Sequence, residues 1–184
     1  MDFIYLAAQT VGLFSMAFNI ISYQQKTRER AIAYQLCGGL LFSVNFFMLG
    51  AYVGGLLNLV AVIRAVVFLN KEKLKADRIL WLAGFTAVYF LSYFLTFTLF
   101  GTDITLKNLI IELLPVIGMV ATTISFRYTD AKTIRKYGLI SSPSWLVYNI
   151  ANFSVGAIIC EMLSLCSILI GMFRFDRNRK TAAE

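Results

Sequence analysis

Apolar residues follow one another along this chain in long stretches that short polar segments separate. A helix needs about 17–25 mostly apolar residues to cross the hydrocarbon of a bilayer. Seven stretches reach that length, and they are residues 3–23, 31–50, 53–69, 79–100, 108–126, 137–153 and 155–173. We therefore predict an all-α protein, a bundle of seven transmembrane helices.

Glycine-containing segments divide two pairs of these stretches. The segment from Gly50 to Gly55 spans the junction of the second and third stretches, and the segment from Asn152 to Gly156 spans the junction of the sixth and seventh. Because glycine and asparagine are frequent in turns, each pair is expected to be two helices joined by a tight turn and not one long helix.

Basic residues gather in alternate loops. Fifteen of the 17 Lys and Arg residues are Lys26, Arg28, Arg30, Lys71, Lys73, Lys75, Arg78, Arg127, Lys132, Arg135, Lys136, Arg174, Arg177, Arg179 and Lys180. In a seven-helix chain these positions all fall on one side of the membrane, and Lys107 is alone on the other. Cytoplasmic loops carry an excess of Lys and Arg. We therefore expect the N-terminus outside the cell and the C-terminus in the cytoplasm.

Composition agrees with a membrane location. The chain is 59% hydrophobic with a mean hydropathy of +0.72, against roughly 45–50% apolar residues in soluble domains. The net charge of +7 comes from short loops between apolar stretches, so we expect a lipid bilayer and no nucleic acid as the partner. The first apolar stretch has full spanning length and no basic residues before it, so no cleavable signal peptide is expected.

The two halves of the chain resemble each other. We divide it into a first three-helix repeat (residues 1–70), a segment with a linker helix (71–107) and a second three-helix repeat with a basic tail (108–184). Two three-helix units can run parallel only if one more crossing separates them, and parallel repeats recur in transporters. Residues 79–100 supply that crossing, and with no charged residue they are expected to face lipid.

Polar residues in the third helix of each repeat form the candidate substrate site. Asn58 matches Glu161 to within one residue, and each lies about 9 Å from the outer end of its helix at 1.5 Å per residue. Ionisable residues inside a membrane are costly and are candidates for function. We expect the two to face each other across the repeat axis, although a hydrogen bond to a neighbouring helix would also explain each.

Further candidates lie in other helices. Trp145 and Asn149 are one turn apart and could form one wall of the site, or Trp145 could simply be packed in the core. Asn45 corresponds roughly to Asn149, and we include it in the expected substrate site. Pro115 and Pro143 lie inside predicted spans, where proline can bend a helix, so we expect hinges there.

Two other ionisable residues are candidates for a gate or an ion pair. Glu112 lies near the outer end of its helix and could instead point to the headgroups. Arg64 lies five residues before Leu69, so its side chain could reach the cytoplasmic boundary or pair with Glu161 or Glu112.

Several chemistries are not expected. The chain has no histidine, which excludes histidine-based metal sites and general bases, and no nucleophile elbow, phosphate-binding loop or dinucleotide motif is present. The three cysteines lie in apolar stretches and are expected to be packing residues. We therefore expect no catalytic residue, no metal and no cofactor, and we do not expect an enzyme.

Several motifs resemble the YgjV family of bacterial inner membrane proteins. They are the run Glu112-Leu113-Leu114-Pro115-Val116-Ile117-Gly118, the run Tyr148-Asn149-Ile150-Ala151-Asn152-Phe153, the segment from Gly156 to Glu161, and the pair Asn58 and Arg64. The resemblance covers most of the chain and implies a location in the bacterial inner membrane.

The expected arrangement of three, one and three helices is also similar to SWEET sugar transporters and PQ-loop proteins. That resemblance implies a substrate-binding asparagine in the third helix of each repeat. Asn58 matches it, whereas the second repeat has Glu161 instead. The Pro-Gln dipeptide of the PQ-loop group is absent, since Val116 follows Pro115.

The leading hypothesis is a transporter or facilitator of a small polar solute with a central site between the repeats. The alternative is a membrane protein that does not transport, and instead binds a partner or senses a ligand. The pattern leaves open which solute would be carried and whether copies of the chain form a homo-oligomer.

Overall fold

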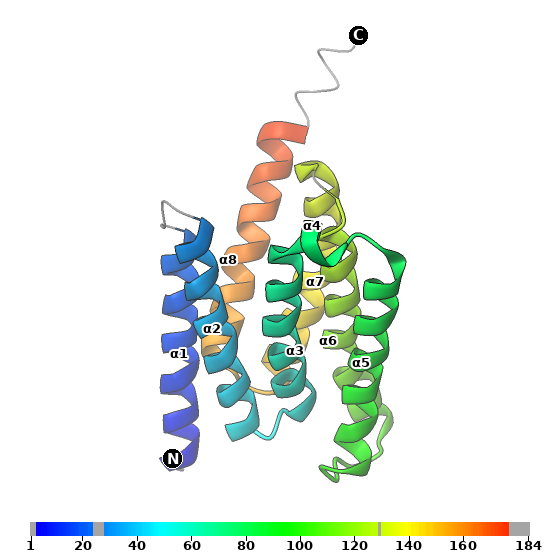
Figure 1. Ribbon diagram of the computed structural model, residues 1–184. Coiled ribbons are helices and arrows are strands. Elements are labelled where there is room, and N and C mark those ends of the chain that lie inside the picture. The colour runs from blue at the N-terminus through cyan, green and yellow to red at the C-terminus, as the bar shows by residue number, and fades with distance from the viewer. Residues whose placement is uncertain (1–2, 24–27, 129, 177–184) are drawn as a thin grey trace.

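The computed structural model describes residues 3–23, 28–128 and 130–176. All of its regular elements in these ranges are helical. They are α1 (Phe3–Tyr23), α2 (Arg28–Met48), α3 (Tyr52–Leu69), α4 (Lys71–Leu74), α5 (Ile79–Thr98), α6 (Leu106–Ser125), α7 (Ala131–Ala151), α8 (Val155–Gly171) and the π-helix η1 (Met172–Asp176). The seven long helices lie side by side in one bundle (Figure 1), so the all-α prediction is confirmed.

The predicted stretches differ from the helices mainly at their ends. α7 begins six residues before position 137, because the Asp130 side chain caps it and accepts a hydrogen bond of 2.8 Å from the Thr133 nitrogen. α6 likewise begins at Leu106, where the side chain of Thr105 accepts a hydrogen bond from the Asn108 nitrogen. Such caps satisfy N–H groups that have no partner inside the helix.

Five helices in the described ranges are long and apolar enough to cross a membrane, two fewer than predicted. They are Phe3–Ser22, Tyr52–Leu69, Ile79–Thr98, Leu106–Ser125 and Val155–Arg174. In α2 the apolar segment is shorter, Ala33–Met48. α7 is as long as α1 but carries several serines, tyrosines and basic residues. We predicted that α2 and α7 cross the membrane because their stretches are long enough. Their polar side chains lower the hydropathy, so neither is among the five.

The bundle has a basic end and a turn end. The basic end, uppermost in Figure 1, carries α4, the end of α8 and exposed side chains such as Lys73, Arg78 and Lys132. The turn end carries the start of α1 and the α2–α3, α5–α6 and α7–α8 connections. The side chains of Lys26, Arg28, Arg177, Arg179 and Lys180 lie outside the described residues.

Neighbouring helices pair in the same way in α1–α3 and in α6–α8. α2 packs against α1 and α3, and α7 packs against α6 and α8. The two sets contact each other at two places: α1 packs against α8, and α3 packs against α6.

The α2–α3 and α7–α8 turns also share one hydrogen-bond pattern. The nitrogen of Gly50 bonds the Phe47 oxygen at 3.2 Å, and the nitrogen of Phe153 bonds the Ile150 oxygen at 3.2 Å. Gly50 and Phe153 both have a positive φ, 72° and 52°. Each residue is therefore 103 positions from its equivalent. This register pairs Asn58 with Glu161, but it pairs Asn45 with Tyr148 and not with Asn149 as we expected.

The helix α5 is more than a lipid-facing connector. It packs against α3 and α6 and buries Phe85, Tyr89, Ser92 and Thr96 there. Leu80, Leu91 and Phe94 on its other positions are exposed. The expectation was therefore wrong for one face of this helix, because absence of charge does not distinguish lipid contact from core packing.

Candidate functional site

A cavity of about 880 Å³ lies between the two sets of three helices. Its lining comes from α1, α2 and α3 on one side and α6, α7 and α8 on the other, together with Phe126 just after α6. Five of the expected site residues line it, namely Asn58, Glu161, Trp145, Asn149 and Arg64. Asn45, Glu112, Pro115 and Pro143 are not among its lining residues.

The cavity extends toward the basic end. Asn19 lies near the end of α1, and Ile134 and Arg135 belong to the first turns of α7, and all three line it. At the other end, which we call the closed end, the lining includes the rings of Phe46 and Trp145, with centroids 6.1 Å apart.

Glu161 is the acidic side chain among the residues that line the cavity. Its side chain projects from α8 and is partly exposed, and the Ser142 hydroxyl of α7 is a hydrogen-bonding partner of its carboxylate. An intramembrane carboxylate that lines a polar space is costly and marks a candidate binding group.

Asn58 occupies the equivalent position on α3. Its side-chain nitrogen donates a hydrogen bond of 2.9 Å to the Gly54 oxygen one turn earlier. The amide is therefore held by its own helix and not by a neighbouring one, while it still lines the cavity.

Trp145 and Asn149 of α7 both line the cavity at its closed end, and their role in binding a substrate stays a prediction. Trp145 is half-buried beside Phe46. Asn149 is only 1% exposed, and its Oδ1 has no hydrogen-bond partner. A buried acceptor without a partner costs about 1–3 kcal/mol, so a ligand donor at this position would relieve a real deficit.

Arg64 is buried in the wall of the cavity and is 6% exposed. Its Nη1 lies 3.0 Å from the Thr123 hydroxyl, 3.2 Å from the Met119 oxygen and 3.4 Å from the Tyr89 hydroxyl. The guanidinium also lies 5.0 Å from the Phe126 ring centroid, while its Nε has no hydrogen-bond partner.

Neither placement expected for the Arg64 side chain is observed, while its role in a gate stays a prediction. It does not extend to the boundary, because Tyr89 and Thr123 hold it inside the bundle. No carboxylate in the described part of the chain is bonded to it. An ion pair with Glu161 or Glu112 would have joined side chains at different depths in the bundle. The Tyr89 hydroxyl of α5 and the Thr123 hydroxyl of α6 lie within hydrogen-bonding distance of the guanidinium instead.

Asn45 lies outside the cavity and ties helices together. Its side-chain nitrogen donates to the Ala8 oxygen at 2.7 Å, and its Oδ1 accepts from the Ser154 hydroxyl at 2.6 Å. Both atoms of the amide are used, and the residue is fully buried. The assignment of Asn45 to the substrate site is therefore wrong, since its partners are α1 and the residue before α8.

Glu112 also lies outside the cavity, near the turn end of α6. It is 7% exposed, so it does not point to the headgroups. The Tyr148 hydroxyl is a hydrogen-bonding partner of its carboxylate and accepts a bond of 2.9 Å from the Gly54 nitrogen. Its Oε2 has no partner. Glu112 thus belongs to a network that joins α6, α7 and α3 across the two sets.

Comparison with known proteins identifies the family. The model of a family described as bacterial inner membrane protein, YgjV type, matches residues 6–179. This chain belongs to that family. The inner membrane protein YgjV of Escherichia coli (strain K12) is 25% identical over 176 residues, which cover 96% of this chain and 88% of the relative. No solved structure matches the chain.

Family membership places the chain in the bacterial inner membrane, as the sequence motifs predicted. Apolar side chains such as Phe14, Leu91 and Ile170 are exposed on the bundle, as expected of a surface that faces a bilayer. The likeness to SWEET and PQ-loop transporters stays a prediction.

Three polar side chains near the site were not predicted. Gln9 donates to the Phe153 oxygen at 2.6 Å and accepts from the Val155 nitrogen at 3.0 Å, which ties α1 to the start of α8. Tyr148 is fully buried, and Ser142 bonds Glu161. Polarity inside an apolar stretch could have indicated Gln9, whereas Tyr148 and Ser142 are common core residues and give no such signal.

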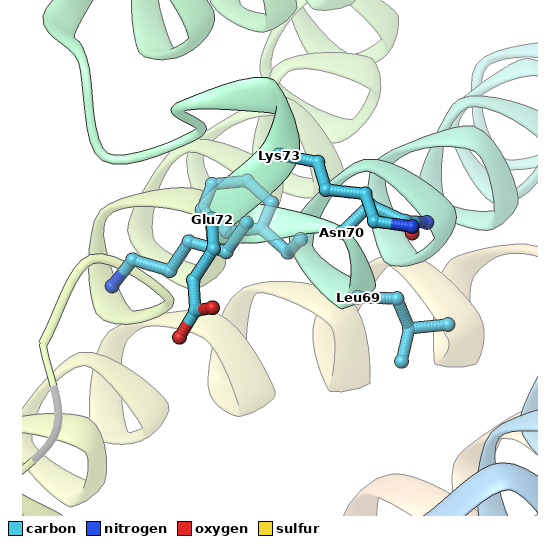
Figure 2. Close-up of a pocket in the computed structure, with 6 residues that line it drawn as sticks. Leu69, Asn70, Glu72 and Lys73 are labelled. Atoms are coloured by element: carbon cyan, nitrogen blue, oxygen red, sulfur yellow. The ribbon is translucent and has the colours of Figure 1, made fainter.

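A smaller hollow of about 400 Å³ lies at the junction of α3 and α4 and is lined by residues 68–73 (Figure 2). Glu72 and Lys73 are exposed and point in different directions there. Polar groups that do not converge cannot hold a solute from several sides, so this hollow is not a candidate site. No group of three His, Cys, Asp or Glu side chains that could hold a metal occurs in the described ranges.

Proposed function

We propose that this protein is a transporter or facilitator of a small polar solute in the bacterial inner membrane. The observation that carries the proposal is the cavity between the two helix sets, with Glu161 and the buried Arg64 in its wall. Such groups are expensive inside a membrane and are kept where a polar solute or ion must pass.

Seven crossings fit the dimensions of the bundle. α2 and α7 each have 21 residues, or about 31 Å at 1.5 Å per residue, which is enough to span the hydrocarbon. Their polar residues Gln35, Ser141 and Asn149 line the cavity. With the basic end in the cytoplasm, the N-terminus is outside.

The two helix sets act as parallel repeats with α5 as the linker. Their common packing pattern and the constant spacing of 103 residues in the turns support this assignment. The solute site then lies on the axis between repeats, where rocking of one against the other would expose it to each side in turn.

The structure corresponds to an inward-open state in this scheme. The cavity reaches the basic end, and the closed end is held by Phe46, Trp145 and the network of Tyr148. Opening to the outside would require this end to separate, and Pro115 and Pro143 inside α6 and α7 are the proposed bending points.

Uptake into proteoliposomes across a panel of small metabolites tests the proposal. Glu161→Gln and Asn58→Ala should lower uptake of the transported solute, whereas Asp103→Asn, an exposed residue of the turn end, should not. Equal uptake by the unmodified protein, the site variants and empty vesicles for every solute would count against transport.

A sensor or interaction protein is the second candidate, and it is favoured by the closure of the cavity at one end. A receptor needs a site that binds from one side only. Saturable binding to the purified protein without any flux would support this function over transport.

A further inference from the structure

Besides Arg135 near the basic end, two opposite charges, Arg64 and Glu161, line the cavity without contacting each other. Arg64 is bonded to Thr123, Met119 and Tyr89, and Glu161 is bonded to Ser142. In a low-dielectric surrounding, opposite charges gain by pairing, and these two are instead held apart by separate partners.

Their separation runs along the helix axes. Glu161 shares the level of Asn58 by the spacing of the turns, and Arg64 follows Asn58 by six residues in α3. At 1.5 Å per residue, Arg64 lies about 9 Å closer to the basic end than Glu161. Between the two levels, α3 contributes Ala61 and Val62 to the lining, both apolar.

Hydrogen-bond acceptors and donors are separated along the cavity in the same direction as the two charges. Near the closed end, the Asn149 Oδ1 and the Glu161 carboxylate are acceptors, and the asparagine oxygen has no partner. Toward the basic end, the Arg64 Nε is a donor without a partner. An ammonium group offers three donors and a carboxylate offers only acceptors, so they complement these two ends.

We propose that the cavity binds a zwitterion whose ammonium and carboxylate are separated by an apolar chain of several bonds. The ammonium contacts Glu161 and Asn149, the carboxylate contacts Arg64, and the chain lies along Ala61 and Val62. This inference rests on the cavity of the proposed function and specifies its substrate class.

Binding to the purified protein in nanodiscs tests the inference by titration calorimetry. The probes are ω-amino acids from glycine to aminooctanoate, with hexylamine and hexanoate as partners that carry one charge each. We expect aminohexanoate or a neighbouring length to bind at least about tenfold more tightly than either single-charge probe, since a charged hydrogen bond contributes about 1.5–3 kcal/mol. Equal affinities for the three, or no binding of any ω-amino acid, would overturn the proposal.

Variants separate the two ends of the ligand. Glu161→Gln should remove the advantage of aminohexanoate over hexanoate, and Arg64→Gln should remove its advantage over hexylamine. Asp103→Asn and Arg78→Gln make the same changes at exposed positions and should leave the affinities unchanged. If Arg64→Gln does not fold, the probe series on the unmodified protein decides alone.

The binding experiment and a transport assay can fail separately. Selective binding of the zwitterion without flux would retain this inference and refute the proposed transport. Saturable flux of a neutral solute or of a singly charged one, with no preference for the zwitterion, would do the opposite.

Discussion

The side-chain hydroxyl of Tyr148 accepts a hydrogen bond of 2.9 Å from the backbone nitrogen of Gly54, which joins α7 to the first turn of α3. The same hydroxyl is bonded to the Glu112 carboxylate of α6. The hydroxyl of one fully buried side chain thus connects three helices at the turn end.

Tyr148→Phe should destabilise the protein by about 1–3 kcal/mol, because it leaves the Gly54 nitrogen and the Glu112 carboxylate without this partner. Unfolding in detergent, followed by circular dichroism, measures the change. Tyr128→Phe removes a hydroxyl from a side chain that is 47% exposed and should have little effect. Equal losses in the two variants would show that the Tyr148 hydroxyl contributes nothing specific.

Gly156→Ala should destabilise the contact between α1 and α8. A Cβ at this position would collide with the backbone oxygen of Gly12, and backbone cannot move aside as a flexible side chain can. Forced separation of packed elements costs about 1–3 kcal/mol. Gly84→Ala is the matched control on α5, where a Cβ meets nothing within 4 Å. A melting temperature for Gly156→Ala as high as for Gly84→Ala would contradict the packing.

Asn45→Ala should lower stability without lowering affinity for a solute in the cavity. The change removes bonds to the Ala8 oxygen and the Ser154 hydroxyl, at about 1–3 kcal/mol for each buried group left unpaired. Asn152→Ala removes only a hydrogen bond to the backbone oxygen of Tyr148, four residues earlier in the chain, so the loss of stability should be smaller. A large fall in binding with unchanged unfolding would return Asn45 to the ligand site.

Thr123→Val should loosen the attachment of α5 to the bundle. Its hydroxyl lies 2.8 Å from the Tyr89 hydroxyl and 3.0 Å from Nη1 of Arg64, so valine removes a partner of both. We expect a loss of about 1–3 kcal/mol in unfolding experiments. Thr98→Val is the control, because the Thr98 hydroxyl is exposed and bonds only the Phe94 oxygen of its own helix. Similar stabilities of the two variants would show that the contacts among Arg64, Tyr89 and Thr123 do not contribute to the stability of the bundle.

Labelling of Cys160 should reveal the open side of the cavity. Cys160 lines the cavity, whereas Cys37 and Cys166 are exposed on the bundle and are not in its lining. With Cys37→Ser and Cys166→Ser, a charged thiol reagent should modify Cys160 in inside-out vesicles and not in right-side-out vesicles.

The matched control for this labelling retains Cys166 alone. Cys166 is exposed on a membrane-length helix outside the cavity lining, so its thiol should react with the charged reagent from neither side. Modification of Cys160 only from the outside would reverse the proposed orientation.

Sequence predicted the helices well because length and hydropathy determine what can cross a bilayer. The predicted start of α1 and of α5 coincides with the structure. α2 and α7 were placed correctly as helices, although their hydropathy is below that of a lipid-exposed span. Their polar residues line the cavity, and that use depends on packing across the two helix sets.

The site was predicted in part for a similar reason. Asn58 and Glu161 were found because comparison of the two halves of the sequence put them at matching positions, and both line the cavity. Arg64 could not be given its partners, because Tyr89 is on the linker helix and has no equivalent in either repeat. Asn45 was assigned with the repeat register wrong by one residue, and one residue rotates a helical side chain by about 100° to another face.

The crossed packing of the bundle has a mechanical consequence. Since α1 packs against α8 and α3 packs against α6, the first helix of each set contacts the last helix of the other. If the two sets rock against each other as proposed, both junctions must rearrange in the same movement. A covalent crosslink at the α1–α8 junction should then also restrict the movement of α3 against α6, which would be long-range coupling without a dedicated signalling element.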